Sequence, residues 1–156
     1  MARRRQAEIR PGKPDTKFGN EELSRFINKV MLNGKKTVAQ RIVYSALDSA
    51  AGSTNQSPVD VFEQAMRNVA PMLEVKPRRV GGATYQVPIE VRSERRTALA
   101  MRWLLAAARA QVGASMSERL YRQLLEASRG QGAAVRRREE LHRMAEANRA
   151  FVHFRW

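Results

Sequence analysis

The chain has 156 residues, no cysteine, and 29 Lys and Arg against 15 Asp and Glu, which gives a formal net charge of +14. Its length suits one domain with one core, and a hydrophobic fraction of 43% excludes a disordered basic tail as a description of the whole chain. The lack of cysteine excludes disulfides and thiolate metal sites. So strong a positive field makes a polyanion such as nucleic acid the expected partner.

Residues 1–19 are predicted to form a flexible basic arm. Six basic residues occur there against two acidic ones, and Pro11, Gly12 and Pro14 disfavour a helix. We expect this arm to become ordered along phosphates once it is bound. Its arginines are Arg3, Arg4, Arg5 and Arg10.

Residues 20–70 are predicted to form three helices. Asn20 is a favourable N-cap, apolar residues follow it at helical spacing, and Asn33-Gly34 supplies a left-handed stop. A second helix is expected over residues 35–51, ended by Gly52. Its predicted buried residues are Val38, Ala39, Ile42, Val43, Ala46 and Leu47.

The polar stretch 53–56 is predicted to be a loop that leads into the third helix. Ser57 is the expected N-cap of that helix, Pro58 suits its first turn, and Pro71 closes it. The predicted buried stripe of the third helix is Val59, Phe62, Ala65, Met66 and Val69.

Residues 72–92 are predicted to form a β-hairpin. Gly81 and Gly82 tolerate the positive φ angles of a two-residue turn. A lone two-stranded hairpin is marginal in water, so it is expected to lean on the helical body or on a partner. The residues that period-two alternation places on one side are Tyr85, Val87, Ile89 and Val91. The cations of the two arms are Lys76, Arg78, Arg79, Arg92, Arg95 and Arg96.

Residues 93–148 are predicted to form three more helices. Ser93 is the expected cap of the first, which runs to about residue 111; Ser115 caps the second, which ends at Gly130; and the third covers residues 133–148. The apolar tail 149–156 is expected to dock on this body or on a neighbour. The predicted fold class is mainly α: a six-helix bundle with one protruding β-hairpin between the third and fourth helices.

Further basic groups lie outside the arm and the hairpin. Lys35 and Lys36 begin the second helix, where outward-pointing backbone N–H groups would help to hold a phosphate. The run 136–138 is the weakest candidate, because Glu139 and Glu140 can pair with it at helical spacing. Each patch alone is typical of a solvated face, but together they favour nucleic-acid binding. The group beside the hairpin base is Arg95, Arg96 and Arg102.

The scarce aromatic residues divide into two sets. One set lies on helical stripes and is predicted to be core. Its members are Phe26, Phe62 and Trp103. The other set either stacks on bases or fills a protein groove, and the pattern leaves both interpretations open. Its members are Tyr85, Phe151, Phe154 and Trp156.

Catalytic motifs are not found. The chain has two histidines and no HExxH, paired-carboxylate cluster or serine-centred elbow. Gly34-Lys35-Lys36 resembles the end of a phosphate loop, but Lys29 stands where that motif requires glycine. We therefore expect no enzyme, no cofactor, no metal and no small-molecule substrate. No apolar run approaches the ~20 residues of a membrane span, and no signal segment is seen, so a cytoplasmic protein without a membrane partner is expected.

Several blocks of the chain, in order, are similar to those of bacterial small-subunit ribosomal protein seven. They are MARRR, FINKVMLNGKK, RIVYSAL, RRVGGATYQVP, RRTALAMRW and MAEANRAFVHFRW. The resemblance runs from the first residues to the last, and it is highly specific because all blocks occur together. It implies a helical bundle with a protruding hairpin, acting as a single rRNA-binding domain over residues 1–156.

The resemblance also implies a function. A member of this family would bind small-subunit rRNA directly and early, and nucleate assembly of the subunit head, the 3′ major domain of that rRNA, on the cytoplasmic ribosome. The residues that match rRNA-facing positions are Arg3, Arg4, Arg5, Arg10, Lys35, Lys36, Lys76, Arg78, Arg79, Arg95, Arg96 and Arg102. Gly81, Gly82 and Tyr85 would lie near the exit-site tRNA. The C-terminal region would lie by the mRNA exit path next to ribosomal protein eleven, with protein nine another neighbour.

The residues alone leave three other functions to compare with rRNA binding. A DNA-binding regulator would also use a basic β-ribbon, and it predicts comparable affinity for duplex DNA and a symmetric dimer. An RNA-processing enzyme would reveal itself by RNA cleavage on addition of magnesium. Binding to a membrane surface is disfavoured, because each helix needs its apolar face for the core.

Overall fold

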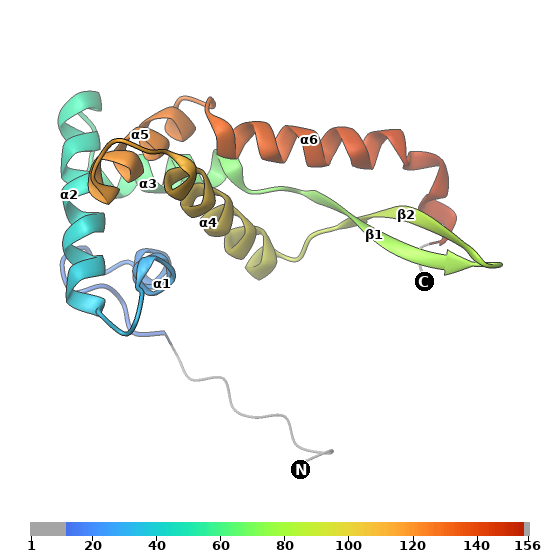
Figure 1. Ribbon diagram of the computed structural model, residues 1–156, viewed down its shortest axis with the longest axis horizontal. Coiled ribbons are helices and arrows are strands. Elements are labelled where there is room, and N and C mark those ends of the chain that lie inside the picture. The colour runs from blue at the N-terminus through green and yellow to red at the C-terminus, as the bar shows by residue number, and fades with distance from the viewer. Residues whose placement is uncertain (1–11, 155–156) are drawn as a thin grey trace, which may run out of the picture.

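The computed structural model describes residues 12–154 and is mainly helical, with an antiparallel hairpin between the third and fourth helices (Figure 1). The predicted fold class is confirmed. The elements are α1 (Glu21–Val30), α2 (Lys36–Thr54), α3 (Pro58–Val69), β1 (Leu73–Val80), β2 (Ala83–Glu90), α4 (Ser93–Ala110), α5 (Met116–Ser128), α6 (Ala133–Ala147) and the short 3-10 helix η1 (Arg149–Phe154). Arg3, Arg4, Arg5, Arg10 and Trp156 lie outside the described residues.

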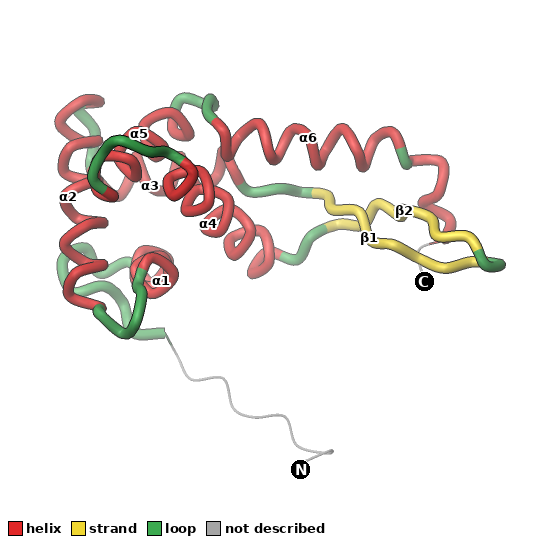
Figure 2. Tube along the Cα trace, in the orientation of Figure 1, coloured by secondary structure: helices red, strands yellow, loops and turns green. Residues whose placement is uncertain are grey.

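The molecule is elongated. Helices α1 to α5 gather at one end, while the hairpin and α6 project from them side by side (Figures 1 and 2). Helix α6 contacts both strands, and η1 folds over β2 near the far end of the hairpin. The predicted need of the hairpin for support is therefore met by the C-terminal part of the same chain.

The core lies among the helices at the body end. Phe26 of α1 and Phe62 of α3 are fully buried, with ring centroids 5.4 Å apart. Leu47 of α2, Leu104 of α4 and Leu124 of α5 complete the same cluster. Full burial of such side chains contributes about 1.5–3 kcal/mol each, so this cluster is the main source of stability.

The start of α1 follows from its cap. Asn20 has an extended backbone, and its side-chain Oδ1 accepts a hydrogen bond from the backbone N–H of Leu23 at 3.0 Å. Its Nδ2 also donates to Glu63 of α3 at 3.3 Å, which ties the cap to a neighbouring helix. At the other end, Asn33 and Gly34 have φ angles of 52° and 73°, as their left-handed stop predicted.

Helix α2 extends further at its C-terminal end than predicted. It continues through Gly52 to Thr54, and Asn55 with a φ of 53° supplies the left-handed end, so the predicted stop at Gly52 and the loop from residue 53 are wrong. Side chains in the last turns bond back onto the helix, with Ser53 Oγ donating to the Ser49 carbonyl. Val38, predicted to be buried, is 46% exposed.

The predicted cap of α5 is confirmed, whereas the predicted cap and one predicted buried residue of α3 are not. Ser115 accepts a hydrogen bond from the Glu118 N–H and caps α5 as expected. Ser57 precedes α3, but its side chain makes no capping bond. Val61 is fully buried in α3 where the pattern had placed Val59, which is only partly buried.

Helix α4 also departs from expectation. Arg92 occupies the cap position, and Ser93, the predicted cap, is the first helical residue. Trp103 was predicted to be core and is only partly buried, packing at the edge of the cluster. An indole this large fits at the periphery of a small core more readily than inside it.

The hairpin has the predicted geometry. Gly81 and Gly82 form the turn with φ angles of 57° and 89°, and Lys76 pairs with Val87 and Arg78 with Tyr85 across the strands. Positive φ at both turn positions matches the right-handed twist of the strands. No helix within residues 12–154 is long and apolar enough to cross a membrane.

Replacing Asn20 by Ala should lower the free energy of unfolding by about 1 kcal/mol, because the Leu23 N–H loses its partner. Ser57→Ala is the matched control, since that N-cap side chain makes no capping bond. Urea denaturation of the two variants and the parent chain measures the difference. Equal losses in both variants would contradict the assignment of the cap.

Candidate nucleic-acid interface

The hairpin presents its cations on both faces of the ribbon. Cross-strand partners share a face, so Lys76 and Arg78 lie on the same side as Val87 and Tyr85. Arg79 lies on the opposite side with Thr84. All three cations are exposed. Arg79 makes no ion pair with any residue in the 12–154 range, which leaves its guanidinium available for a phosphate.

The cations at the hairpin base are partly occupied by the protein itself. Arg95 Nε donates to both carboxylate oxygens of Glu74, at 3.0 and 2.8 Å, and Arg96 Nε donates to the Val91 carbonyl at 2.7 Å. Arg102, two turns further along α4, is exposed and unpaired within the described part of the chain. Of these three arginines, Arg102 is therefore available for a phosphate, whereas Arg95 and Arg96 hold the hairpin base.

Lys35 and Lys36 lie at the tight connection from α1 to α2. Lys35 occupies the N-cap position without any side-chain capping bond, and both lysines are exposed. Neither forms an ion pair with another described residue. Two unpaired ammonium groups therefore stand where the backbone N–H groups of α2 emerge, as the sequence predicted.

An apolar groove of about 390 Å³ lies beside these lysines. Of the described residues on its rim, three are cations and none is an acid, and two of the cations, Arg109 and Arg119, were not among the predicted site residues. Exposed Val38 belongs to the groove, which explains its departure from the predicted core. The apolar side chains along it are Val30, Met31, Leu32, Val38, Ala39, Ile42 and Met116.

Two of the three arginines in the α6 run are paired, in agreement with its rank as the weakest candidate. Arg137 lies 3.1 Å from Glu140, and Arg138 lies 3.6 Å from Glu139. Arg138 Nη1 also donates to the carbonyl of Asn68 at 2.6 Å, which joins α6 to the end of α3. These contacts give Arg138 a structural role.

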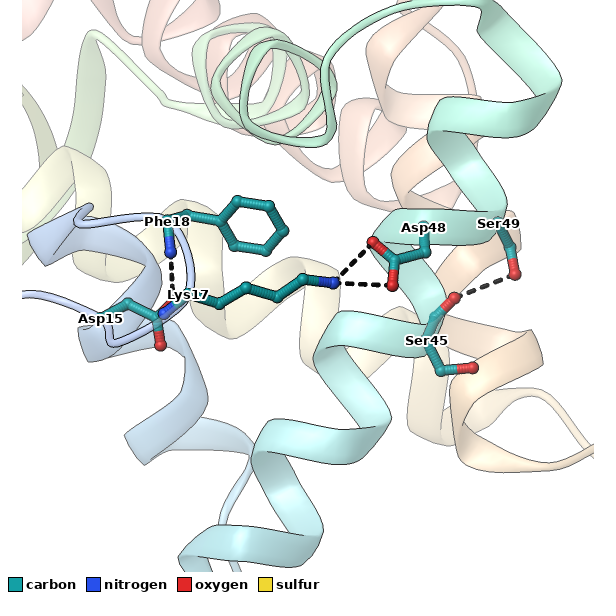
Figure 3. Close-up of polar contacts among 6 residues, drawn as sticks. All are labelled: Asp15, Lys17, Phe18, Ser45, Asp48 and Ser49. Carbon is teal, nitrogen blue, oxygen red and sulfur yellow. Dashed lines mark hydrogen bonds and ion pairs between the residues drawn. The ribbon is translucent and has the colours of Figure 1, made fainter.

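The segment before α1 is anchored to α2 (Figure 3). Buried Asp15 accepts hydrogen bonds from the backbone N–H groups of Lys17 and Phe18 at 3.1 Å. It also accepts one from the Tyr44 hydroxyl at 2.6 Å. Lys17 Nζ lies 2.8 Å from Asp48. Burial, followed by the hydrogen bond to Asp15, raises the pKa of Tyr44 above its usual value. Residues 15–19 therefore belong to the folded body, and the boundary of the arm is nearer the N-terminus than residue 19.

The aromatic tail docks on the hairpin. The ring of Tyr85 lies 5.1 Å from that of Phe151 and 5.2 Å from that of Phe154, measured between centroids. Of the two interpretations left open for Tyr85, packing within the protein is the one that this geometry favours. Phe151 and Phe154 likewise pack on this chain.

His142 joins α6 to the start of the hairpin. Its Nε2 accepts a hydrogen bond from the Met72 backbone N–H at 3.0 Å. Burial and then the positive charge of Arg138 lower the pKa of His142 below its usual 6.5. The neutral ring is the form that can accept this bond, so the joint and the direction of the pKa shift agree.

Comparison with known proteins accounts for this combination of basic body and basic ribbon. The family model described as ribosomal protein S7p/S5e matches residues 2–149. The chain belongs to this family. Three small ribosomal subunit proteins uS7 are 58%, 60% and 57% identical to it over 156 residues and over the full length of both chains. They come from Afipia carboxidovorans, Xanthobacter autotrophicus and Dehalococcoides mccartyi.

Membership in the S7p/S5e family confirms the resemblance seen in the sequence. The chain is a structural constituent of the small ribosomal subunit, and so a ribonucleoprotein component that binds rRNA and serves translation on the ribosome. It is not an enzyme. Within residues 12–154, no group of His, Asp and Glu side chains could hold a metal ion.

Acidification should destabilise this S7p/S5e protein through His142. Because its pKa is lowered on folding, the unfolded chain binds the proton more readily, and stability is lost as the pH falls below about 6.5. His142→Gln keeps an acceptor for Met72 without titrating, so the loss between about pH 7.5 and pH 5.5 should be smaller in that variant. His153→Gln, at an exposed histidine, should retain the parent loss in urea denaturation. An equal loss of stability on acidification in the parent chain and both variants would contradict this role of His142.

Proposed function

We propose that this ribosomal protein is a primary rRNA-binding protein that nucleates assembly of the subunit head, the 3′ major domain of the small-subunit rRNA. The observation that carries the proposal is the placement of unpaired cations at both ends of one elongated body. Lys35 and Lys36 lie at the α1–α2 connection, and Arg79 lies on the projecting hairpin (Figure 1). A single rRNA-binding unit of this shape can contact RNA helices that are separated within a junction.

The mechanism is positional. An RNA helix exposes phosphates and 2′-hydroxyls, while its deep major groove resists side chains, so recognition depends on shape. The two basic surfaces are held at a fixed distance from each other. The protein therefore favours RNA junctions whose phosphates have the same spacing. Later proteins would then bind to a junction already held in its final geometry.

The proposed contacts follow the predicted residues, with two changes of role. Arg95 and Arg96 act at the hairpin base, where their Nε groups already bond to protein. The proposed phosphate contacts within the described residues are Lys35, Lys36, Lys76, Arg78, Arg79 and Arg102. The contacts proposed on family resemblance alone are Arg3, Arg4, Arg5 and Arg10.

The apolar groove beside Lys35 suits an unstacked base. Its floor offers apolar contact to a base, and its cationic rim, which includes Arg109 and Arg119, offers contact to the flanking phosphates. RNA loops and bulges supply such bases, which gain by leaving water for an apolar surface. This contact would add specificity to a surface that otherwise reads only charge and shape.

The hairpin end is proposed to lie near the exit-site tRNA, with Gly81 and Gly82 at its tip. Tyr85, packed on Phe151 and Phe154, would shape this end. The C-terminal region is proposed to lie by the mRNA exit path. Ribosomal proteins eleven and nine of the small subunit are the proposed protein neighbours, on family resemblance.

Binding to a transcript of the rRNA head-domain junction tests the proposal, with a scrambled RNA and a duplex DNA as competitors. If roughly 6–10 phosphates are neutralised, affinity should fall by about three to five decades between 50 and 200 mM salt, extending a rule framed for duplex DNA. The junction RNA should remain bound at physiological salt when both competitors are lost. Equal loss of all three would reject the proposed assembly role.

Within this assay, Arg79→Gln should weaken junction binding and reduce the salt slope by about one. Arg137→Gln removes the same charge from a side chain already paired with Glu140, so its affinity and slope should stay close to the parent values. Equal effects of the two variants would show that total charge alone governs binding.

Met116→Gln should weaken junction binding about threefold to tenfold without changing the salt slope, because the groove contact is apolar. Val112→Gln is the control, since Val112 is 88% exposed and does not line the groove. Filter binding across the salt series separates affinity from slope. An unchanged affinity for Met116→Gln would remove the groove from the interface.

A further inference from the structure

Glu74 is an acidic residue buried within a basic hairpin. It is 7% exposed, lies in β1, and has two cations beside it, Lys76 and Arg95. Burial of a carboxylate is costly unless it is paired and hydrogen-bonded, so its contacts ought to reveal why it is there. An acid at this point also opposes the attraction of the hairpin for polyanions.

The contacts of Glu74 cross from one element to another. Arg95 Nε, in the first turn of α4, donates to its two oxygens at 3.0 and 2.8 Å. Lys76 Nζ, on the same face of β1, lies 3.8 Å away. The carboxylate therefore links the first strand of the hairpin to the helix that follows the second strand.

This link belongs to a joint at the hairpin base. The Val91 N–H donates to the Met72 carbonyl at 2.9 Å, and Arg96 Nε donates to the Val91 carbonyl. These bonds use backbone acceptors and do not involve the side chain at position 74. Among residues 12–154, the Glu74 carboxylate is the one group of strand β1 to which Arg95, the preceding residue on α4, is bonded.

We propose that Glu74 is a positioning residue for RNA recognition, which holds Arg95 and thereby fixes the direction of the hairpin relative to the helical body. The inference rests on the proposed function, because it presumes that hairpin and body contact one RNA together. A hairpin fixed before binding spares the complex the entropy of ordering it. The acid is retained for this geometry although it reduces the positive charge of the surface.

The proposal and a simple charge argument predict opposite signs. Removing an acid from a polycation strengthens RNA binding if only charge matters. Removing a positioning residue weakens binding to the junction RNA, because the hairpin then samples several directions. Glu90 is the matched control: it is exposed on β2, lines the same surface pocket as Glu74 and Arg95, and has no ion pair within residues 12–154.

The experiment compares Glu74→Gln with Glu90→Gln in the full-length chain. Spin labels at Thr84→Cys and Ser45→Cys, both exposed sites in a chain without cysteine, report the distance from hairpin tip to α2. Glu74→Gln should broaden the distance distribution measured without RNA and weaken junction binding about fivefold to tenfold. Glu90→Gln should keep the parent distribution and bind about twofold more tightly at low salt.

A second variant protects the test against a failure to fold. Arg95→Gln alters a side chain that is 54% exposed and should broaden the distances to the same extent, and the double variant should broaden them no further. Parent-like distances in Glu74→Gln, or tighter junction binding like that of Glu90→Gln, would overturn the proposal. Failure of the parent chain to prefer junction RNA would instead reject the proposed function, since the distances are measured without RNA.

Discussion

An isolated two-stranded ribbon is marginal in water, so the reach of this hairpin depends on apolar contacts from the C-terminal part of the chain. Helix α6 contacts both strands, and the rings of Phe151 and Phe154 pack on Tyr85 near the far end. Without that support the basic ribbon would be an extra flexible arm. With it, the ribbon stays folded along its length, and the contacts at its base can then set its direction relative to the helical body.

Because the ribbon is supported along its length, the polar contacts at its base can set its direction. The Glu74–Arg95 pair, the bond from Arg96 to the Val91 carbonyl, and the bond from Met72 to His142 each join the hairpin to a helix. Each is a modest contribution alone, since half-exposed ion pairs and single hydrogen bonds contribute about 1 kcal/mol. Their effect is on direction, because they act where a small rotation produces a large displacement of the tip.

Local causes were predictable from the sequence, and distant ones were not. The caps at Asn20 and Ser115 involve atoms three residues away, and the glycine turn of the hairpin involves only its own dihedral angles. Val38 lies on an apolar stripe, yet no neighbouring element covers it, so the same periodicity that marks a core residue here marks the wall of a groove. Gly52 does not end α2, because Ser53 and Thr54 bond back to the carbonyls of the preceding turn and Asn55 supplies the left-handed cap after Thr54.

The sequence by itself determined that the partner is negatively charged, in which order the helices and strands follow, and to which family the chain belongs. Net charge, hydrophobic periodicity and ordered blocks of residues are properties of the chain that need no folding. Only the tertiary structure decided which cations are free. Arg79 is unpaired within the described residues, whereas Arg95 meets an acid 21 positions earlier, and no local pattern encodes that meeting. The same holds for Tyr85, whose partners come from the far end of the chain. Contacts between distant residues exist only after folding, which is why the sequence left these roles open.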